Sequence, residues 1–160
     1  QQAKPVISKI NTERFFEEFV TDNSLAIKQH DNQLDMKIEL PIIFADNKLF
    51  RRILDNLLSN AIAHGSKGGP ISIKVYQQEN MQVLDFANRG QKIALEQRHA
   101  LFQPFSRGEG VRNDRVTGSG LGLSIVADCG RMMFGKAEMV DVDYADVCIR
   151  VQIPSKEASI

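Results

Sequence analysis

The chain has 160 residues, of which 42% are hydrophobic and 25% charged, a composition typical of one folded globular domain. Its 20 basic and 20 acidic residues cancel, which excludes a general electrostatic attraction to nucleic acid or to an anionic membrane. Cys129 and Cys148 lack the spacing of a metal or redox pair, so free thiols are expected. No apolar run is long enough to span a membrane.

Apolar spacing predicts both helices and strands along the chain. The predicted elements are a helix over 13–30, a strand over 34–40, a helix over 51–64 capped by Asp46, strands over 71–77 and 81–88, a short helix over 94–102, a polar loop over 106–118, a helix over 119–134, and strands over 136–142 and 146–153. Strands that follow one another directly favour a mixed, mostly antiparallel sheet. The predicted fold is therefore α+β, a two-layer α/β sandwich with helices on one face, and not a doubly wound Rossmann fold.

The helix over 51–64 carries an unexpected row of polar side chains. Asn56, Asn60 and His64 stand at i, i+4 and i+8, beside a face of Leu and Ile. Asparagine is a mediocre helix former, and it costs free energy when it is buried without partners. The row therefore needs an explanation other than helix stability.

A glycine-rich segment, "GSGLGL", precedes the last predicted helix and places Gly118, Gly120 and Gly122 at alternate positions. Glycines let the backbone approach a phosphate closely, and the free N–H groups of a helix start favour an anion. The pattern alone is equally consistent with a flexible turn in which Ser119 caps the helix. It is neither the Walker loop, which needs G-K-[ST], nor the dinucleotide fingerprint, which follows a strand directly.

A second segment of interest ends the strand over 81–88. Strand alternation places Leu84, Phe86 and Asn88 on one face, so Asn88 points inward, whereas Asp85 points outward. An inward polar side chain followed by Gly90 suits a buried ligand, although an ordinary Asn-Arg-Gly turn explains it as well.

Together these segments resemble the ATP-binding catalytic domain of bacterial sensor histidine kinases, in the ATPase superfamily shared with gyrase, Hsp90 and MutL. "DNLLSNAIAHG" looks like the N box, and "NRGQKI" lies where the first glycine box belongs. "LFQPFSRG" resembles the F box and "TGSGLGLSIV" the second glycine box, in the family's order. The resemblance covers residues 12–154 and implies a Bergerat-type fold. Residues 1–11 are interpreted as a linker from an upstream helical domain and 155–160 as a tail.

The resemblance also implies roles for individual residues. Asn60 would hold Mg²⁺ through its side-chain oxygen, while Asn56 would line the phosphates and Arg107 would reach the terminal one, both acting in catalysis. Asn88 would accept the adenine amino proton. The remaining ATP-binding residues would be His64, Gly90, Ile93, Phe105, Gly118, Ser119, Gly120, Leu121, Gly122 and Leu123, with 108–117 as a lid that Phe102 and Phe105 anchor.

Three positions depart from the family's pattern. Asn88 replaces the usual Asp, and an uncharged acceptor makes a hydrogen bond roughly half as strong. Lys92 replaces a glycine of the first box, and Ala63 stands where a phosphate-contacting Lys is common. We therefore expect modest ATP affinity.

The chemistry that the resemblance implies is phosphoryl transfer rather than hydrolysis. Related hydrolases place a Glu where this chain has Asn56, and an amide cannot act as a base near neutral pH. His30, His64 and His99 lack the H-[ED]-x-x-x-P surroundings of a phosphoacceptor. The acceptor histidine would then belong to the protein's own dimerisation domain.

The implied setting is two-component signalling. A response regulator would take the phosphoryl group, and nucleic acid would have no part. The chain would be a monomeric, cytoplasmic part of a homodimeric inner-membrane sensor. Two alternatives stay open: a related ATPase that drives conformational change, and a degenerate nucleotide-binding module with a regulatory role.

Overall fold

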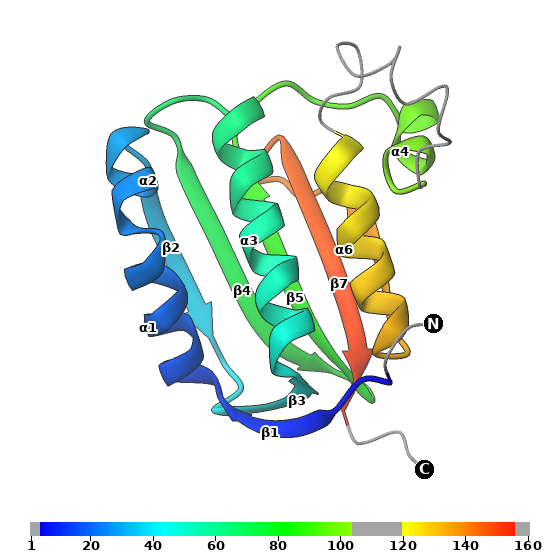
Figure 1. Ribbon diagram of the computed structural model, residues 1–160. Coiled ribbons are helices and arrows are strands. Elements are labelled where there is room, and N and C mark those ends of the chain that lie inside the picture. The colour runs from blue at the N-terminus through cyan, green and yellow to red at the C-terminus, as the bar shows by residue number, and fades with distance from the viewer. Residues whose placement is uncertain (1–3, 104–119, 156–160) are drawn as a thin grey trace.

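The structure is a computed structural model that describes residues 4–103 and 120–155. In chain order its elements are β1 (Ile7–Asn11), α1 (Thr12–Asp22), α2 (Ser24–Gln29), β2 (Gln33–Ile38), β3 (Ile42–Asp46), α3 (Asn47–His64), β4 (Pro70–Gln78), β5 (Met81–Asn88), α4 (Leu95–Leu101), α6 (Gly120–Met132), β6 (Lys136–Val140) and β7 (Val147–Pro154), labelled as in Figure 1. No helix in these two ranges is long and apolar enough to cross a membrane.

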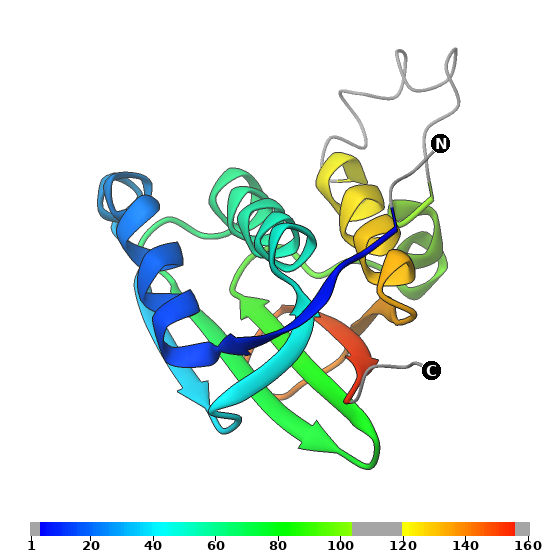
Figure 2. The same cartoon turned by 60° about the horizontal axis from the view of Figure 1, so that its bottom comes forward.

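A five-stranded sheet with the order β2-β4-β5-β7-β6 forms one layer of the molecule. The pair β2–β4 is parallel, whereas β4–β5, β5–β7 and β6–β7 are antiparallel. Helices α1, α3 and α6 lie side by side over one face of this sheet, as Figures 1 and 2 show. The prediction of a mixed, mostly antiparallel two-layer sandwich is confirmed.

A small second sheet was not foreseen from the sequence. Strand β1 pairs with β3 in antiparallel register, from Ile7 opposite Asp46 to Asn11 opposite Ile42. Ile43 and Ala45 of β3 are almost fully buried. The segment 1–11, interpreted as a linker, thus contributes an ordered strand before residue 12.

The predicted single helix over 13–30 is wrong, because two helices, α1 and α2, meet at Asn23. The Asn23 side chain donates from Nδ2 to the Phe19 carbonyl oxygen at 2.9 Å and to Asp55 Oδ1 at 3.2 Å. An Asn side chain that competes with the backbone for carbonyl partners favours a break in a helix.

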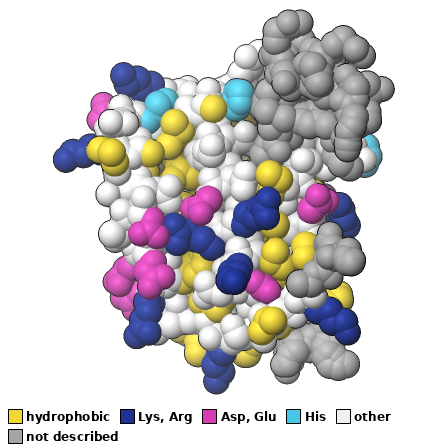
Figure 3. All heavy atoms as spheres, viewed as in Figure 1, with side chains coloured by type: hydrophobic (Ala, Val, Ile, Leu, Met, Phe, Trp, Pro, Cys, Tyr) yellow, Lys and Arg dark blue, Asp and Glu magenta, His cyan; other side chains and the backbone are white. Residues whose placement is uncertain are grey.

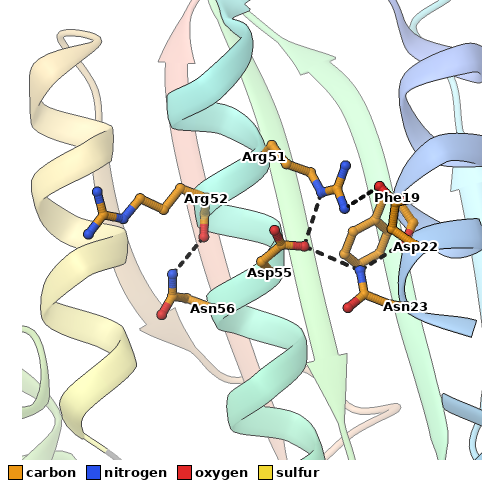
Figure 4. Close-up of polar contacts among 7 residues, drawn as sticks. All are labelled: Phe19, Asp22, Asn23, Arg51, Arg52, Asp55 and Asn56. Carbon is orange, nitrogen blue, oxygen red and sulfur yellow. Dashed lines mark hydrogen bonds and ion pairs between the residues drawn. The ribbon is translucent and has the colours of Figure 1, made fainter. Parts of the chain in front are cut away.

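Helix α1 is fastened to α3 by aromatic packing and by one arginine. Phe15 and Phe50 pack with ring centroids 5.2 Å apart. Arg51 of α3 forms ion pairs with Asp22 at 2.9 Å and Asp55 at 3.0 Å, as drawn in Figure 4. The outer surface of the helical layer carries Lys and Arg intermixed with Asp and Glu (Figure 3), in keeping with a net charge of zero.

The opposite face of the sheet holds a buried charge. Asp85 lies on that face, as strand alternation predicts, but it is only 3% exposed. Its carboxylate accepts hydrogen bonds from Arg150 at 2.8 and 3.0 Å and from the Tyr76 hydroxyl at 2.9 Å. The predicted direction of Asp85 is confirmed, whereas its burial was not predicted, because the neighbouring strands supply partners that a single strand does not reveal.

Candidate functional site

Helix α3 positions the row of polar residues. Asp46 caps its N-terminus by accepting from the backbone N–H groups of Lys48 and Leu49 at 3.0 and 3.1 Å. The apolar face is buried against the core through Phe50, Ile53, Leu54, Leu57, Leu58 and Ala61. With that face fixed, Asn56 and Asn60 are half-buried at its shoulder, and His64 is exposed at the last turn.

Asn56 lies on the side of α3 that faces α6, opposite the side on which Arg51 and Asp55 contact α1 (Figure 4). Its Nδ2 donates to the Arg52 carbonyl oxygen of the preceding turn at 2.8 Å. This bond fixes the orientation of the amide, so that its Oδ1 is left as a hydrogen-bond acceptor.

Asn60 is a suitable but sparse ligand for a metal ion. Within the described ranges its side chain makes no hydrogen bond, and no three His, Cys, Asp or Glu side chains gather into a metal site. Mg²⁺ prefers oxygen ligands, keeps several waters, and is often held by one or two protein groups together with substrate phosphates. The amide oxygen of Asn60 is compatible with Mg²⁺ bound together with a nucleotide, to which it would supply one ligand.

The end of β5 lies against the end of α3. Gly65 and Gly90 form an antiparallel bridge, and a Cβ on Gly65 would lie only 2.8 Å from Asn88 Nδ2. A Cβ on Gly90 would also be in tight contact, at 3.2 Å from the His64 carbonyl oxygen. Glycines at both positions therefore let the end of α3 and the end of β5 approach each other closely.

The Asn88 amide has a defined orientation at this junction. Its Nδ2 donates to the Arg89 carbonyl oxygen at 2.9 Å. That bond leaves Oδ1 as the free acceptor, and an acceptor is what an adenine amino group requires. Asn88 is half-buried, and its role toward adenine stays a prediction.

Helix α6 begins at Gly120, and its first turn lies at the same end of the molecule as the last turn of α3 (Figure 1). Gly120, Leu121 and Gly122 belong to this turn, whose backbone N–H groups suit an anion. The Leu123 side chain is only 3% exposed and packs in the core, so only its backbone is left to face a nucleotide.

Several predicted site residues cannot be placed. Phe105, Arg107, Gly118, Ser119 and the segment 108–117 lie outside the described residues. Ile93 is partly buried and packs against the core, and Phe102 is buried directly after α4.

Two contacting residues were missed. Asp146 accepts from the Gly90 backbone N–H at 3.1 Å, and Arg98 donates from Nε to the Ile93 carbonyl oxygen at 2.9 Å. Asp146 is 56 residues from Gly90 in the chain, and no local pattern signals such a contact.

Comparison with known proteins finds a family and relatives that this chain resembles. The family model of the histidine kinase-, DNA gyrase B-, and HSP90-like ATPases matches residues 45–157. The sensor histidine kinase GlrK of Escherichia coli (strain K12) is 36% identical over 141 residues, which cover 88% of this chain but only 30% of GlrK.

Solved structures share the fold. The catalytic domain of the histidine kinase ThkA has a TM-score of 0.78 at 21% identity, covering 94% of this chain and 97% of that domain. ThkA in complex with the response regulator protein TrrA has a TM-score of 0.73 at 18% identity, covering 96% of this chain and 43% of that one. The last turn of α3, the first glycine box at the end of β5 and the start of α6 lie at one end of the fold (Figure 1). Because the family model matches more than half of the sequence, the chain belongs to the histidine kinase-, DNA gyrase B- and HSP90-like ATPases, a family of ATP-binding domains.

Proposed function

We propose that this chain is the catalytic domain of a sensor histidine kinase, which presents ATP and Mg²⁺ to a histidine outside the chain. The observation that carries the proposal is Asn56. It is half-buried beside α6, its amide is bonded to the Arg52 carbonyl, and it stands where hydrolases of this family carry a glutamate base. An amide cannot take a proton from water near neutral pH, so transfer to another acceptor is favoured over hydrolysis.

Each side chain has a defined task in this proposal. Asn88 Oδ1 accepts from the adenine amino group, and the first turn of α6 faces the phosphates. Asn60 holds Mg²⁺, which neutralises charge on the phosphates when it is bound. Such positioning and charge neutralisation account for most of the catalysis in phosphoryl transfer.

The proposal also covers the longer protein to which the chain would belong and its partner. The chain spans 30% of the length of GlrK. We infer a longer, homodimeric sensor in which a separate dimerisation domain supplies the acceptor histidine, with this domain on the cytoplasmic side of the membrane. The TrrA complex of ThkA supports a response regulator as the partner that receives the phosphoryl group.

Labelling with γ-³²P-ATP tests this function. The full-length protein should acquire an acid-labile phosphohistidine, and its Asn60→Ala variant should not. The isolated chain should bind ATP without steady turnover. Sustained hydrolysis by the chain alone would instead indicate a conformational ATPase. A degenerate regulatory module would give two negative results. The full-length protein would stay unlabelled, and ATP with Mg²⁺ would leave the melting temperature of the isolated chain unchanged.

A further inference from the structure

The connection between β6 and β7, residues 141–146, holds the first glycine box in place. The backbone N–H of Asp146 donates to the Asn88 carbonyl oxygen at 3.2 Å. The Asp146 side chain in turn accepts from the Gly90 N–H, with Oδ2 at 3.1 Å from that nitrogen. One residue thereby bonds the backbone on both sides of Arg89.

The same connection also reaches the far end of the glycine-box segment. Arg98 of α4 donates from Nε to the Ile93 carbonyl oxygen at 2.9 Å, and its Nη2 donates to Asp141 at 3.0 Å. The Arg98 side chain is only 14% exposed, so this ion pair is partly shielded from water. Residues 88–93 are thus held near both ends from one connection.

The connection is itself anchored to the sheet. The Lys74 ammonium of β4 lies 4.0 Å from the ring centroid of Tyr144, a distance at which cation–π attraction is effective. Asp146 is followed at once by β7, where Val147 pairs with Asn88 in the ladder. The backbone position of Asp146 is therefore fixed relative to the sheet.

The geometry links Asp146 to the base-recognising amide of Asn88. The Asn88 side chain is oriented by its bond to the Arg89 carbonyl oxygen. That carbonyl belongs to the peptide unit whose N–H, on Gly90, is bonded to Asp146. The Arg89 carbonyl oxygen also accepts from the Ser66 backbone N–H at 2.8 Å. If the Asp146 carboxylate is removed, this peptide unit is held from its carbonyl side alone, and the direction of Asn88 Oδ1 is less firmly fixed.

We propose that Asp146 is a positioning residue for nucleobase recognition, acting on Asn88 through the Arg89–Gly90 peptide. The inference rests on the proposed binding of ATP. It predicts a specific defect: affinity is lost where the ligand carries a 6-amino group and is largely kept where it does not.

Calorimetric titration of the 160-residue chain with ATP and with inosine triphosphate, both with Mg²⁺, tests the proposal. Inosine triphosphate has a carbonyl in place of the amino group. Since hydrogen bonds to charged groups contribute enough for roughly a tenfold effect, Asp146→Ala should weaken ATP binding about tenfold and inosine triphosphate binding much less. Asp146→Asn keeps an acceptor for the Gly90 N–H and should retain most of the preference for ATP.

The matched control is Asp143→Ala, which removes the same charge from an exposed position of the same connection and should leave both affinities unchanged. Equal weakening of both nucleotides by Asp146→Ala would assign Asp146 a merely structural role and overturn the proposal. Unchanged binding of both nucleotides by Asp146→Ala would also overturn the proposal. In either case the proposed function would stand. Absence of ATP binding by the unmodified chain would overturn the proposed function and this inference together.

Discussion

At the scale of single residues, the amide at Asn88, where the family usually has a carboxylate, would set the strength of base recognition in the proposed function. A neutral acceptor makes a weaker bond to the adenine amino group than a charged one. Ala63 is exposed beside His64 and offers no donor to a phosphate. Both features agree with a domain that binds ATP only modestly. Such a domain can still act as a kinase, because the acceptor needs positioned ATP rather than tightly held ATP.

The protonation of buried groups behind the sheet also belongs to this scale. Burial, assisted by the hydrogen bond to Asp85, raises the pKa of Tyr76 from 10.0 to about 12. Burial raises the pKa of the Cys148 thiol from 9.0 to about 12 as well. The unfolded chain thus loses these protons at lower pH than the folded chain does. The stability from these groups is complete below about pH 9 and is lost as pH rises toward about 12.

This prediction is open to a direct spectroscopic check, because the chain has two tyrosines and no tryptophan. Burial also raises the pKa of Tyr144 to about 12. We expect the ultraviolet absorbance of tyrosinate to appear only near pH 12 in the folded chain, and near pH 10 in urea. Ionisation of both tyrosines near pH 10 in the folded chain would show that the two side chains are solvated.

At the scale of elements, helix α3 has two roles that belong to neighbouring faces. Its Leu and Ile residues fill the core, and this burial fixes the rotation of the helix. The rotation in turn sets Asn56 and Asn60 at the shoulder that faces α6 and brings His64 to the end of β5. Strand β5 has a similar division, because Leu84 and Phe86 face the helices whereas Asp85 faces Arg150 of β7.

The pairing of β5 with β7 yields a prediction about stability. Arg150→Met should destabilise the fold by roughly 2–3 kcal/mol, because the Asp85 carboxylate stays buried with one partner fewer. Arg150 is partly exposed, so this loss of stability is smaller than for a fully buried ion pair. Adding Asp85→Asn removes the uncompensated charge and should restore part of the loss. Urea unfolding of the two single variants and the double variant measures this. Additive losses would show that the two side chains are not coupled.

At the scale of the whole molecule, the period of the apolar residues and the order of the predicted elements were enough to predict most of the fold. The hairpin β4–β5 and helix α3 followed from local patterns, and the order of elements indicated the sandwich. The β1–β3 sheet was missed because each strand has only five residues and is stabilised by its distant partner. The break at Asn23 depends on Asp55, which is 32 residues away.

The site divides in the same way. The places of Asn56, Asn60, His64 and Asn88 on their helix and strand could be predicted, because motif residues carry their own local signal, and their roles in the site stay predictions. Asp146 and Arg98 were not, because they act on backbone atoms of a segment far away in the sequence. Any residue can present a backbone N–H or carbonyl, so the sequence holds no mark of these contacts.

In the proposed function, Asn60 couples ATP binding to Mg²⁺. Calorimetry should show ATP binding to the chain in Mg²⁺, weaker than submicromolar, and loss of the signal with EDTA. Asn60→Ala should abolish the Mg²⁺-dependent binding without lowering the melting temperature, since alanine is the better helix former. Asn47→Ala, at an exposed position of the same helix, should bind as the unmodified chain does. If Asn60→Ala binds ATP in Mg²⁺ as tightly as the unmodified chain does, Asn60 does not couple ATP binding to Mg²⁺.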